Sequence, residues 1–242
     1  MLLWRCCCVV VKSLVESGCV QSVSCSWDRM CLVSRGLCYV CDLVTSLCQR
    51  ITVPQTDHPN TSADTSAALL QATRGPAQER FTSVETNDVM TLAVTSERGL
   101  LSVSADGHVV RLWSVFKVQS VSCGQSHALV LSAIGVVFSC GLGNHGQLGH
   151  GSVESQQTLR PVEALEGLMV TLVCAGGWHS MAVSDCGDVY VWGWNEAGQL
   201  GLHRHIEPHS SSSNSDTTCQ SHVVVDITRI NLYSCTSVTV FG

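Results

Sequence analysis

Two histidines are the first residues whose type and spacing could do chemistry. His127 and His179 close the same Gly-x-x-His pattern, 52 positions apart (179 − 127). Such a histidine could serve as a general base, because imidazole titrates near neutral pH. No nucleophilic or acidic side chain recurs beside the two residues. We therefore expect structural histidines that bond backbone groups where strands turn, with no catalytic residue and no enzyme activity.

Metal chemistry would have to come from cysteines and from a cluster of histidines. The chain has 15 cysteines, crowded toward the amino terminus, but Cys38-x-x-Cys41 has no second pair at zinc-ribbon spacing. His203, His205 and His209 lie in a polar segment without a cysteine at ligand spacing. We expect free buried thiols in a reducing compartment, no metal site and no cofactor. A zinc-binding or redox protein, acting through the cysteine-rich amino terminus, stays open as an alternative.

Aromatic side chains near predicted loops are the candidates for recognition. Exposed aromatic residues in loops contribute more to binding a partner than to stability. We expect a partner-binding site made of Trp178, Trp194, Asn195, Glu196 and His145.

The elements that must position these residues are repeated. A glycine-punctuated pattern of strand, turn, strand and loop occurs twice with a constant offset of 52 positions, and Trp192 lies in the second strand of the later copy. A period of about 50 residues with strand-forming content is typical of propeller blades. The paired structural positions are His127 and His179, Gly135 and Gly187, Gly141 and Gly193, Gln147 and Gln199, and Gly149 and Gly201.

The pattern resembles a known repeat. Gly-x-x-His, a short apolar strand, Gly-x-Val-Tyr-x-Trp-Gly and then Gly-Gln-Leu-Gly is similar to the regulator of chromosome condensation repeat, which builds seven-bladed propellers. The resemblance covers residues 118–202. It implies an all-β fold, a β-propeller of this repeat type. Two good blades, one degenerate and one partial are fewer than seven, so we expect an incomplete or open propeller.

The resemblance also carries a function. Within the family, residues 175–180 and 192–200 look like those of a chromatin-associated member. This implies a non-enzymatic adaptor in the nucleus or on the chromosome, with the cytoplasm as a further location. Its implied partners are a jumonji-type histone demethylase and chromatin, in histone H3 methylation and chromosome segregation. Guanine-nucleotide exchange on a small GTPase, as the founding member performs, is the alternative, although no segment can be assigned as the inserted wedge.

The rest of the chain is less regular. The hexapeptide at 20–25 recurs letter for letter at 118–123, and Asp28 is taken to stand where later copies have histidine. Asp106-Gly107 predicts a hairpin turn. We expect a divergent amino terminus (1–17), a degenerate blade (18–50), a polar linker (51–80), a hairpin or partial blade (81–116), two propeller repeats (117–168 and 169–202) and a Ser/His-rich linker with a divergent tail (203–242).

Composition excludes several classes of protein. The net charge of −6 and the lack of a Lys/Arg cluster argue against direct binding of nucleic acid. No window supplies the roughly 20 apolar residues of a membrane span. The first twelve residues lack the basic start and small-residue cleavage site of a signal peptide, so we expect an intracellular chain without membrane contact.

Overall fold

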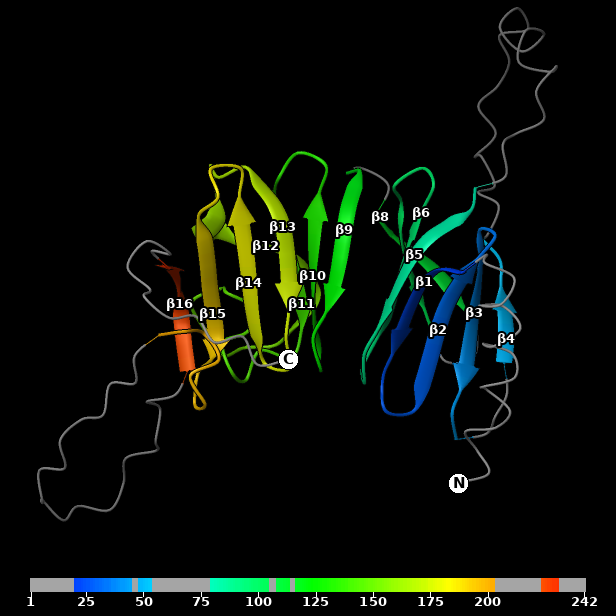
Figure 1. Ribbon diagram of the computed structural model, residues 1–242, viewed down its shortest axis with the longest axis horizontal. Coiled ribbons are helices and arrows are strands. Elements are labelled where there is room, and N and C mark those ends of the chain that lie inside the picture. The colour runs from blue at the N-terminus through cyan, green and yellow to red at the C-terminus, as the bar shows by residue number, and fades with distance from the viewer. Residues whose placement is uncertain are drawn as a thin grey trace, which may run out of the picture. The chain divides into compact units, whose positions relative to one another are not determined.

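The computed structural model describes residues 20–44, 48–53, 79–104, 108–113, 116–202 and 223–230. Over these ranges the chain forms sixteen strands and one short 3-10 helix, η1 (Glu163–Leu165), with no α-helix. The strands make four antiparallel sheets of four strands each (Figure 1). The all-β class predicted from the sequence is confirmed. The amino-terminal segment, the turn at 106–107 and the histidines at 203, 205 and 209 lie outside the described residues.

The chain divides into two compact units, each with two sheets that we call blades. The first unit holds the first blade, β1 (Val20–Cys25), β2 (Arg29–Ser34), β3 (Leu37–Asp42) and β4 (Cys48–Ile51), and most of the second, β5 (Phe81–Thr86), β6 (Thr91–Thr95), β7 (Leu100–Val103) and β8 (Val109–Trp113). The second unit holds the third blade, β9 (Val118–Cys123), β10 (His127–Ser132), β11 (Val137–Gly141) and β12 (Gln156–Pro161), and the fourth, β13 (Val170–Ala175), β14 (His179–Ser184), β15 (Val189–Trp194) and β16 (Val223–Ile230).

The sequence explains the shape of each blade. In the third and fourth blades the hairpin turns contain Gly135 and Gly187, at φ +79° and +84°, a region that side chains disfavour. β10 is buried along its whole length, because both of its faces are covered. The core of the second unit packs Leu129 and Leu131 of the third blade with Ala182 and Trp192 of the fourth. Each blade therefore depends on its neighbour for its apolar core.

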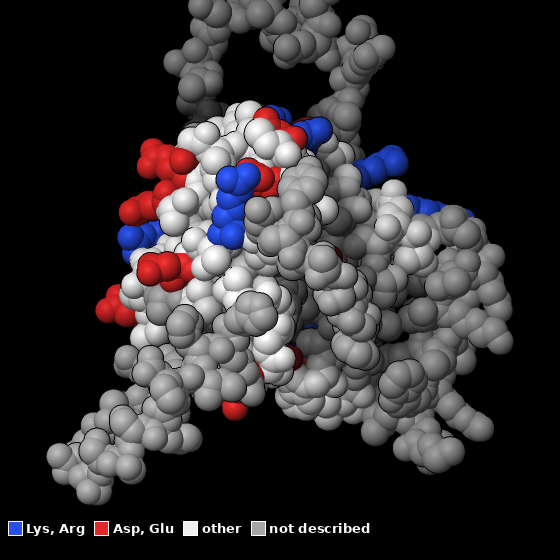
Figure 2. Space-filling model, turned by 60° about the vertical axis from the view of Figure 1, so that its left-hand side comes forward, with Lys and Arg blue, Asp and Glu red and all other residues white. Residues whose placement is uncertain are grey.

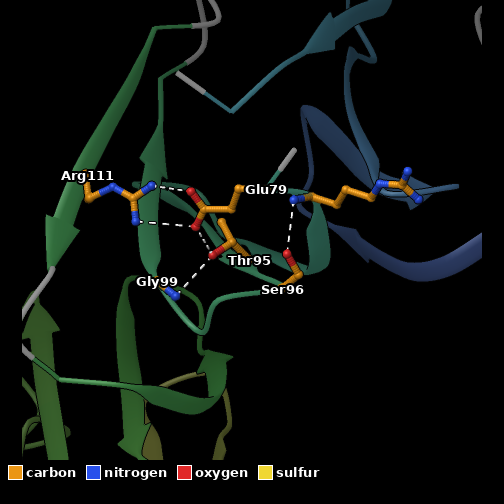
Figure 3. A network of polar contacts seen from close by, with 6 residues as sticks. Glu79, Thr95, Ser96, Gly99 and Arg111 are labelled. Atoms are coloured by element: carbon orange, nitrogen blue, oxygen red, sulfur yellow. Dashed lines mark hydrogen bonds and ion pairs between the residues drawn. The ribbon is translucent and has the colours of Figure 1, made fainter. Parts of the chain in front are cut away.

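A polar network braces the second blade (Figure 3). The guanidinium of Arg111 on β8 donates two hydrogen bonds, of 2.5 and 3.4 Å, to the carboxylate of Glu79 just before β5. The Thr95 hydroxyl donates to the same carboxylate and accepts the backbone N–H of Gly99 at 3.1 Å. The Arg111 and Glu79 side chains are only 24% and 14% exposed, so this ion pair is largely shielded from water. Its two parallel hydrogen bonds hold β8 to the segment just before β5.

The first blade corrects one prediction. Arg29, not Asp28, occupies the position of His127: Arg29 lies opposite Asp42 as His127 lies opposite Gly141. The reason is register, since the identical hexapeptides lie 98 positions apart and 127 − 98 is 29. Arg29 Nη1 donates to Thr91 Oγ1 of the second blade at 3.2 Å.

The cysteines give a second correction. Cys41 and Cys48 lie opposite each other on β3 and β4 and form a disulfide, so the expectation of free thiols is wrong for this pair. Direct cross-strand pairing explains it, because opposite residues have their Cβ atoms within reach of a disulfide. Cys38 and Cys140 remain thiols, and burial raises their pKa values to about 12 and about 11. Across the described ranges no three His, Cys, Asp or Glu side chains gather as a metal site.

The described part of the chain contains no helix long and apolar enough to cross a membrane.

Gly124 shows why the repeat begins with glycine. A Cβ there would lie 2.3 Å from Cε1 of the His127 ring and 2.2 Å from the carbonyl oxygen of Gly176 in the next blade. Gly176 has the same relation to His179, at 2.2 Å from its Cε1. The Gly-x-x-His spacing therefore lets the imidazole fold back onto its own turn.

Substituting Gly124→Ala tests this packing. We expect a loss of about 2 kcal/mol or more in the free energy of unfolding, because the added methyl group has to displace backbone as well as the ring. Gly177→Ala is the matched control, since a Cβ at Gly177 meets nothing within 4 Å. Urea denaturation measures both variants, and equal midpoints for the two would refute the packing argument.

Candidate protein-interaction site

Three aromatic rings meet where the third and fourth blades adjoin. Trp178 lies in the turn between β13 and β14, Trp194 ends β15, and His145 lies in the loop after β11. The His145 ring stacks on Trp178 with centroids 4.8 Å apart and an angle of 11°. Trp194 presents itself edgewise, 4.8 Å from Trp178 and 5.6 Å from His145. The structure thus brings together three of the five residues predicted to bind a partner, and we call them the aromatic cluster.

Backbone contacts hold the aromatic cluster in place. The N–H of Trp194 donates to the carbonyl oxygen of Trp178 at 2.9 Å, and the N–H of His145 donates to Gln147 Oε1 at 2.8 Å. Gly193 has φ +103°, and a Cβ there would lie 2.7 Å from Trp178 O and 3.3 Å from Gln147 Cα. Glycine at this position therefore allows the three segments to approach. All three rings are half-buried, so part of each ring stays open to solvent.

The other two predicted residues lie in the following loop. Asn195 is only 7% exposed, and its Oδ1 accepts the backbone N–H of Leu200 at 3.0 Å. Its side chain therefore braces the loop. Glu196 is exposed next to it.

Beneath the aromatic cluster, the two blades are joined by a buried polar network. The main-chain carbonyl of Gln147 accepts two hydrogen bonds of 2.8 Å, from Ser180 Oγ and from Trp192 Nε1. His127 Nε2 lies 2.9 Å from Ser180 Oγ. Because the one hydroxyl proton of Ser180 goes to Gln147, His127 must donate from Nε2–H. Its Nδ1 then carries a lone pair, which is buried without a partner. All four residues are fully buried.

The sequence indicates His127, Gln147 and Trp192 as structural positions but gives no sign of Ser180. The repeat hides it, because the position after the histidine holds serine in one copy and Ala128 in the other. The remaining repeat positions lie at strand ends and in loops. Gly141 and Gly193 lie at or near the ends of their strands, and Gly149 packs against Trp192. Gln199 Oε1 accepts the N–H of Ala197 at 2.9 Å, Gly201 has φ +68°, and His179 is half-buried.

Comparison with known proteins agrees with this geometry. A family model described as "Regulator of chromosome condensation (RCC1) repeat" matches residues 135–183 and 186–215, and a second model of the same description matches 118–147 and 170–199. Residues 118–215 are RCC1 repeats. The resemblance predicted from the sequence is confirmed for this stretch.

Relatives and solved structures extend the comparison. The chain is 55% identical to human RCC1 domain-containing protein 1 over 86 residues, 36% of this chain and 23% of that protein. Its fold is similar to the crystal structure of human WBSCR16 (TM-score 0.64, 19% identity, 88% of this chain and 54% of that one). It is also similar to yeast RCC1 (Prp20) bound to Kap60 (TM-score 0.60, 17% identity, 87% and 48%). The predicted propeller fold is confirmed, and the four described blades form no closed sheet.

Two Ser–His contacts in the RCC1 repeats could be mistaken for catalytic pairs. Ser180 with His127, and Ser139 with His150 at 3.0 Å, have the distances of a nucleophile and its base. Both serines are fully buried, and each donates its hydroxyl proton to a main-chain carbonyl, that of Gln147 or Leu148. The geometry therefore makes them structural.

Burial in the RCC1 repeats also sets the charge of these histidines. Burial, together with the nearby His179, lowers the pKa of His127 to about 4. Burial lowers the pKa of His179 as well. His127 is thus neutral at pH 7, as its single-donor role requires.

The His127 pKa predicts how stability depends on pH. Because the folded pKa of about 4 lies below the ordinary value of 6.5, the unfolded chain binds the proton more tightly. Stability is therefore fully present above about pH 6.5 and falls as the pH drops toward 4, by about 2 kcal/mol between pH 7 and pH 5. Urea denaturation at both pH values measures this change. His127→Gln should lose that share of the pH dependence, and an unchanged difference between pH 7 and pH 5 in the variant would contradict the assignment.

Proposed function

We propose that the chain is a non-enzymatic interaction module that binds a protein partner through the aromatic cluster. Trp178 and Trp194 are half-exposed at loop ends, where partner side chains can reach them. Tryptophan is enriched among the residues that dominate binding energy at interfaces. Rings already held by backbone hydrogen bonds lose little conformational freedom on binding.

For the partner, we propose a chromatin-associated adaptor role with a jumonji-type histone demethylase, in histone H3 methylation and chromosome segregation. Support comes from the 55% identity to human RCC1 domain-containing protein 1. The chain spans 23% of the length of that relative, so the activity of the whole relative enters here only as a proposal. Yeast RCC1, which has a similar fold, is a protein with a protein partner, Kap60. A nuclear or chromosomal location follows from the same proposal.

The packing of Trp178, Trp194 and His145 is the observation that carries the proposal. Affinity purification of the tagged full-length chain from nuclei, read by mass spectrometry, tests it. We expect recovery of a histone demethylase or histones, reduced at least tenfold by the double substitution Trp178→Ala/Trp194→Ala, because truncating interface tryptophans commonly costs about 2 kcal/mol or more each.

Trp27→Ala is the matched control. Trp27 is 73% exposed on the corresponding turn of the first blade, so its loss should leave recovery unchanged. Equal recovery with the double variant would refute the binding site. Recovery of other proteins that depend on the two tryptophans, without a demethylase or histones, would refute only the chromatin role. Recovery of nothing but chaperones would refute both the binding site and the chromatin role. Urea denaturation confirms that each variant is folded.

A further inference from the structure

We infer that the aromatic cluster receives a protein segment rich in lysine or arginine. This inference rests on the proposed function and deepens it by naming the chemistry of the partner.

The second unit, which carries the aromatic cluster, is strongly acidic. Its described residues contain nine Asp and Glu against three Lys and Arg, so its net charge is 3 − 9 = −6. The described residues of the first unit carry six Arg against four Asp and Glu, or 6 − 4 = +2. The acidity of the chain is therefore concentrated in the unit that holds the RCC1 repeats. In the view of Figure 2, most of the visible Asp and Glu side chains lie toward the left-hand edge, with a Lys or Arg side chain between them.

The three described cations of the second unit lie away from the aromatic cluster or are neutralised. Arg229 forms an ion pair with Asp188 at 2.5 Å. Arg229 lies opposite Tyr190, and Tyr190 is four residues, or about 13 Å, along β15 from Trp194. Lys117 precedes β9, and its carbonyl oxygen accepts the N–H of Ala133 at the opposite end of the blade. Arg160 forms an ion pair of 3.1 Å with Glu163.

Exposed carboxylates lie on the segments that build the aromatic cluster or pack against it. Glu196 follows Trp194 by two positions. The backbone of Glu154 packs against Gly143, which lies two positions before His145. A Cβ added at Gly143 would be 2.0 Å from the carbonyl oxygen of Glu154.

A third carboxylate belongs to Asp88, whose backbone is connected to the turn of Trp178 by two successive hydrogen bonds. The N–H of Asp88 donates to Gln125 O at 3.3 Å, and the N–H of Gln125 donates to the carbonyl oxygen of Gly177, the neighbour of Trp178, at 3.0 Å. All three carboxylate residues are exposed.

Half-exposed indoles, with carboxylates on the same and neighbouring segments, suit a cationic side chain. A guanidinium or ammonium group is attracted to the electron-rich face of an indole, and tryptophan is the best of the aromatic residues for this contact. The carboxylates attract the same group and raise the rate of encounter with a basic partner. A polyanion such as nucleic acid would instead be repelled from this face.

The test measures fluorescence anisotropy of a fluorescein-labelled twelve-residue peptide of alternating lysine and glycine, titrated with the full-length chain at low salt. We expect saturable binding that weakens at least tenfold in Trp178→Ala/Trp194→Ala and about threefold in Glu154→Gln/Glu196→Gln. Trp27→Ala and Asp185→Asn are controls that should bind as the natural sequence does. Asp185 is exposed in the turn between β14 and β15, at the opposite end of the blade.

Several outcomes would overturn the inference. Equal binding to the tryptophan double variant would mean that net charge alone holds the peptide. Failure of the lysine peptide to bind, or preferential binding of a glutamate–glycine peptide or a labelled DNA duplex, would refute a basic ligand. If nuclear partners are captured through Trp178 and Trp194 while the lysine peptide does not bind, the proposed function stands and this inference falls. If the peptide binds through the tryptophans and no nuclear partner is recovered, the reverse holds.

Discussion

The main-chain carbonyl of Gln147 is the group on which the RCC1-repeat unit depends. It accepts the hydroxyl of Ser180 and the indole N–H of Trp192, so one peptide of the third blade satisfies two buried donors of the fourth. Ser180 in turn accepts the proton of His127, which closes the network back onto the third blade. Buried donors without acceptors are costly, so a network in which each of these three donors has an acceptor specifies how the two sheets pack against each other.

The aromatic cluster is built on the same peptide. The side chain of Gln147 fixes the backbone of His145, while Gly193 lets the Trp178 and Trp194 segments approach Gln147 from the other blade. The surface that we propose for binding is thus positioned by the buried contact between the blades. A tight loop end supported by a rigid sheet is a suitable place for a recognition site, because little order remains to be gained on binding.

The sequence predicted much of this arrangement, because strand period and glycine spacing are local signals. It could predict His127, Gln147 and Trp192 as structural, since they recur or lie at fixed places in the repeat. It could not predict that His145 stacks on Trp178, because these residues come from different repeats and meet only through packing between blades. The ion pair of Glu79 and Arg111 lies within one blade, but it could not be predicted either, because 32 positions of sequence separate the partners and only the folded sheet brings them together.

One contact between blades recurs in both units. Arg29 of the first blade donates to Thr91 of the second, and His127 of the third donates to Ser180 of the fourth, in each case from the first residue of a second strand to one of the first two residues of the neighbour's second strand. The fourth blade returns two hydrogen bonds to the third, from Ser180 and Trp192. The two faces of such a blade therefore carry different donors and acceptors, so two blades that met through the same face would not reproduce these pairs.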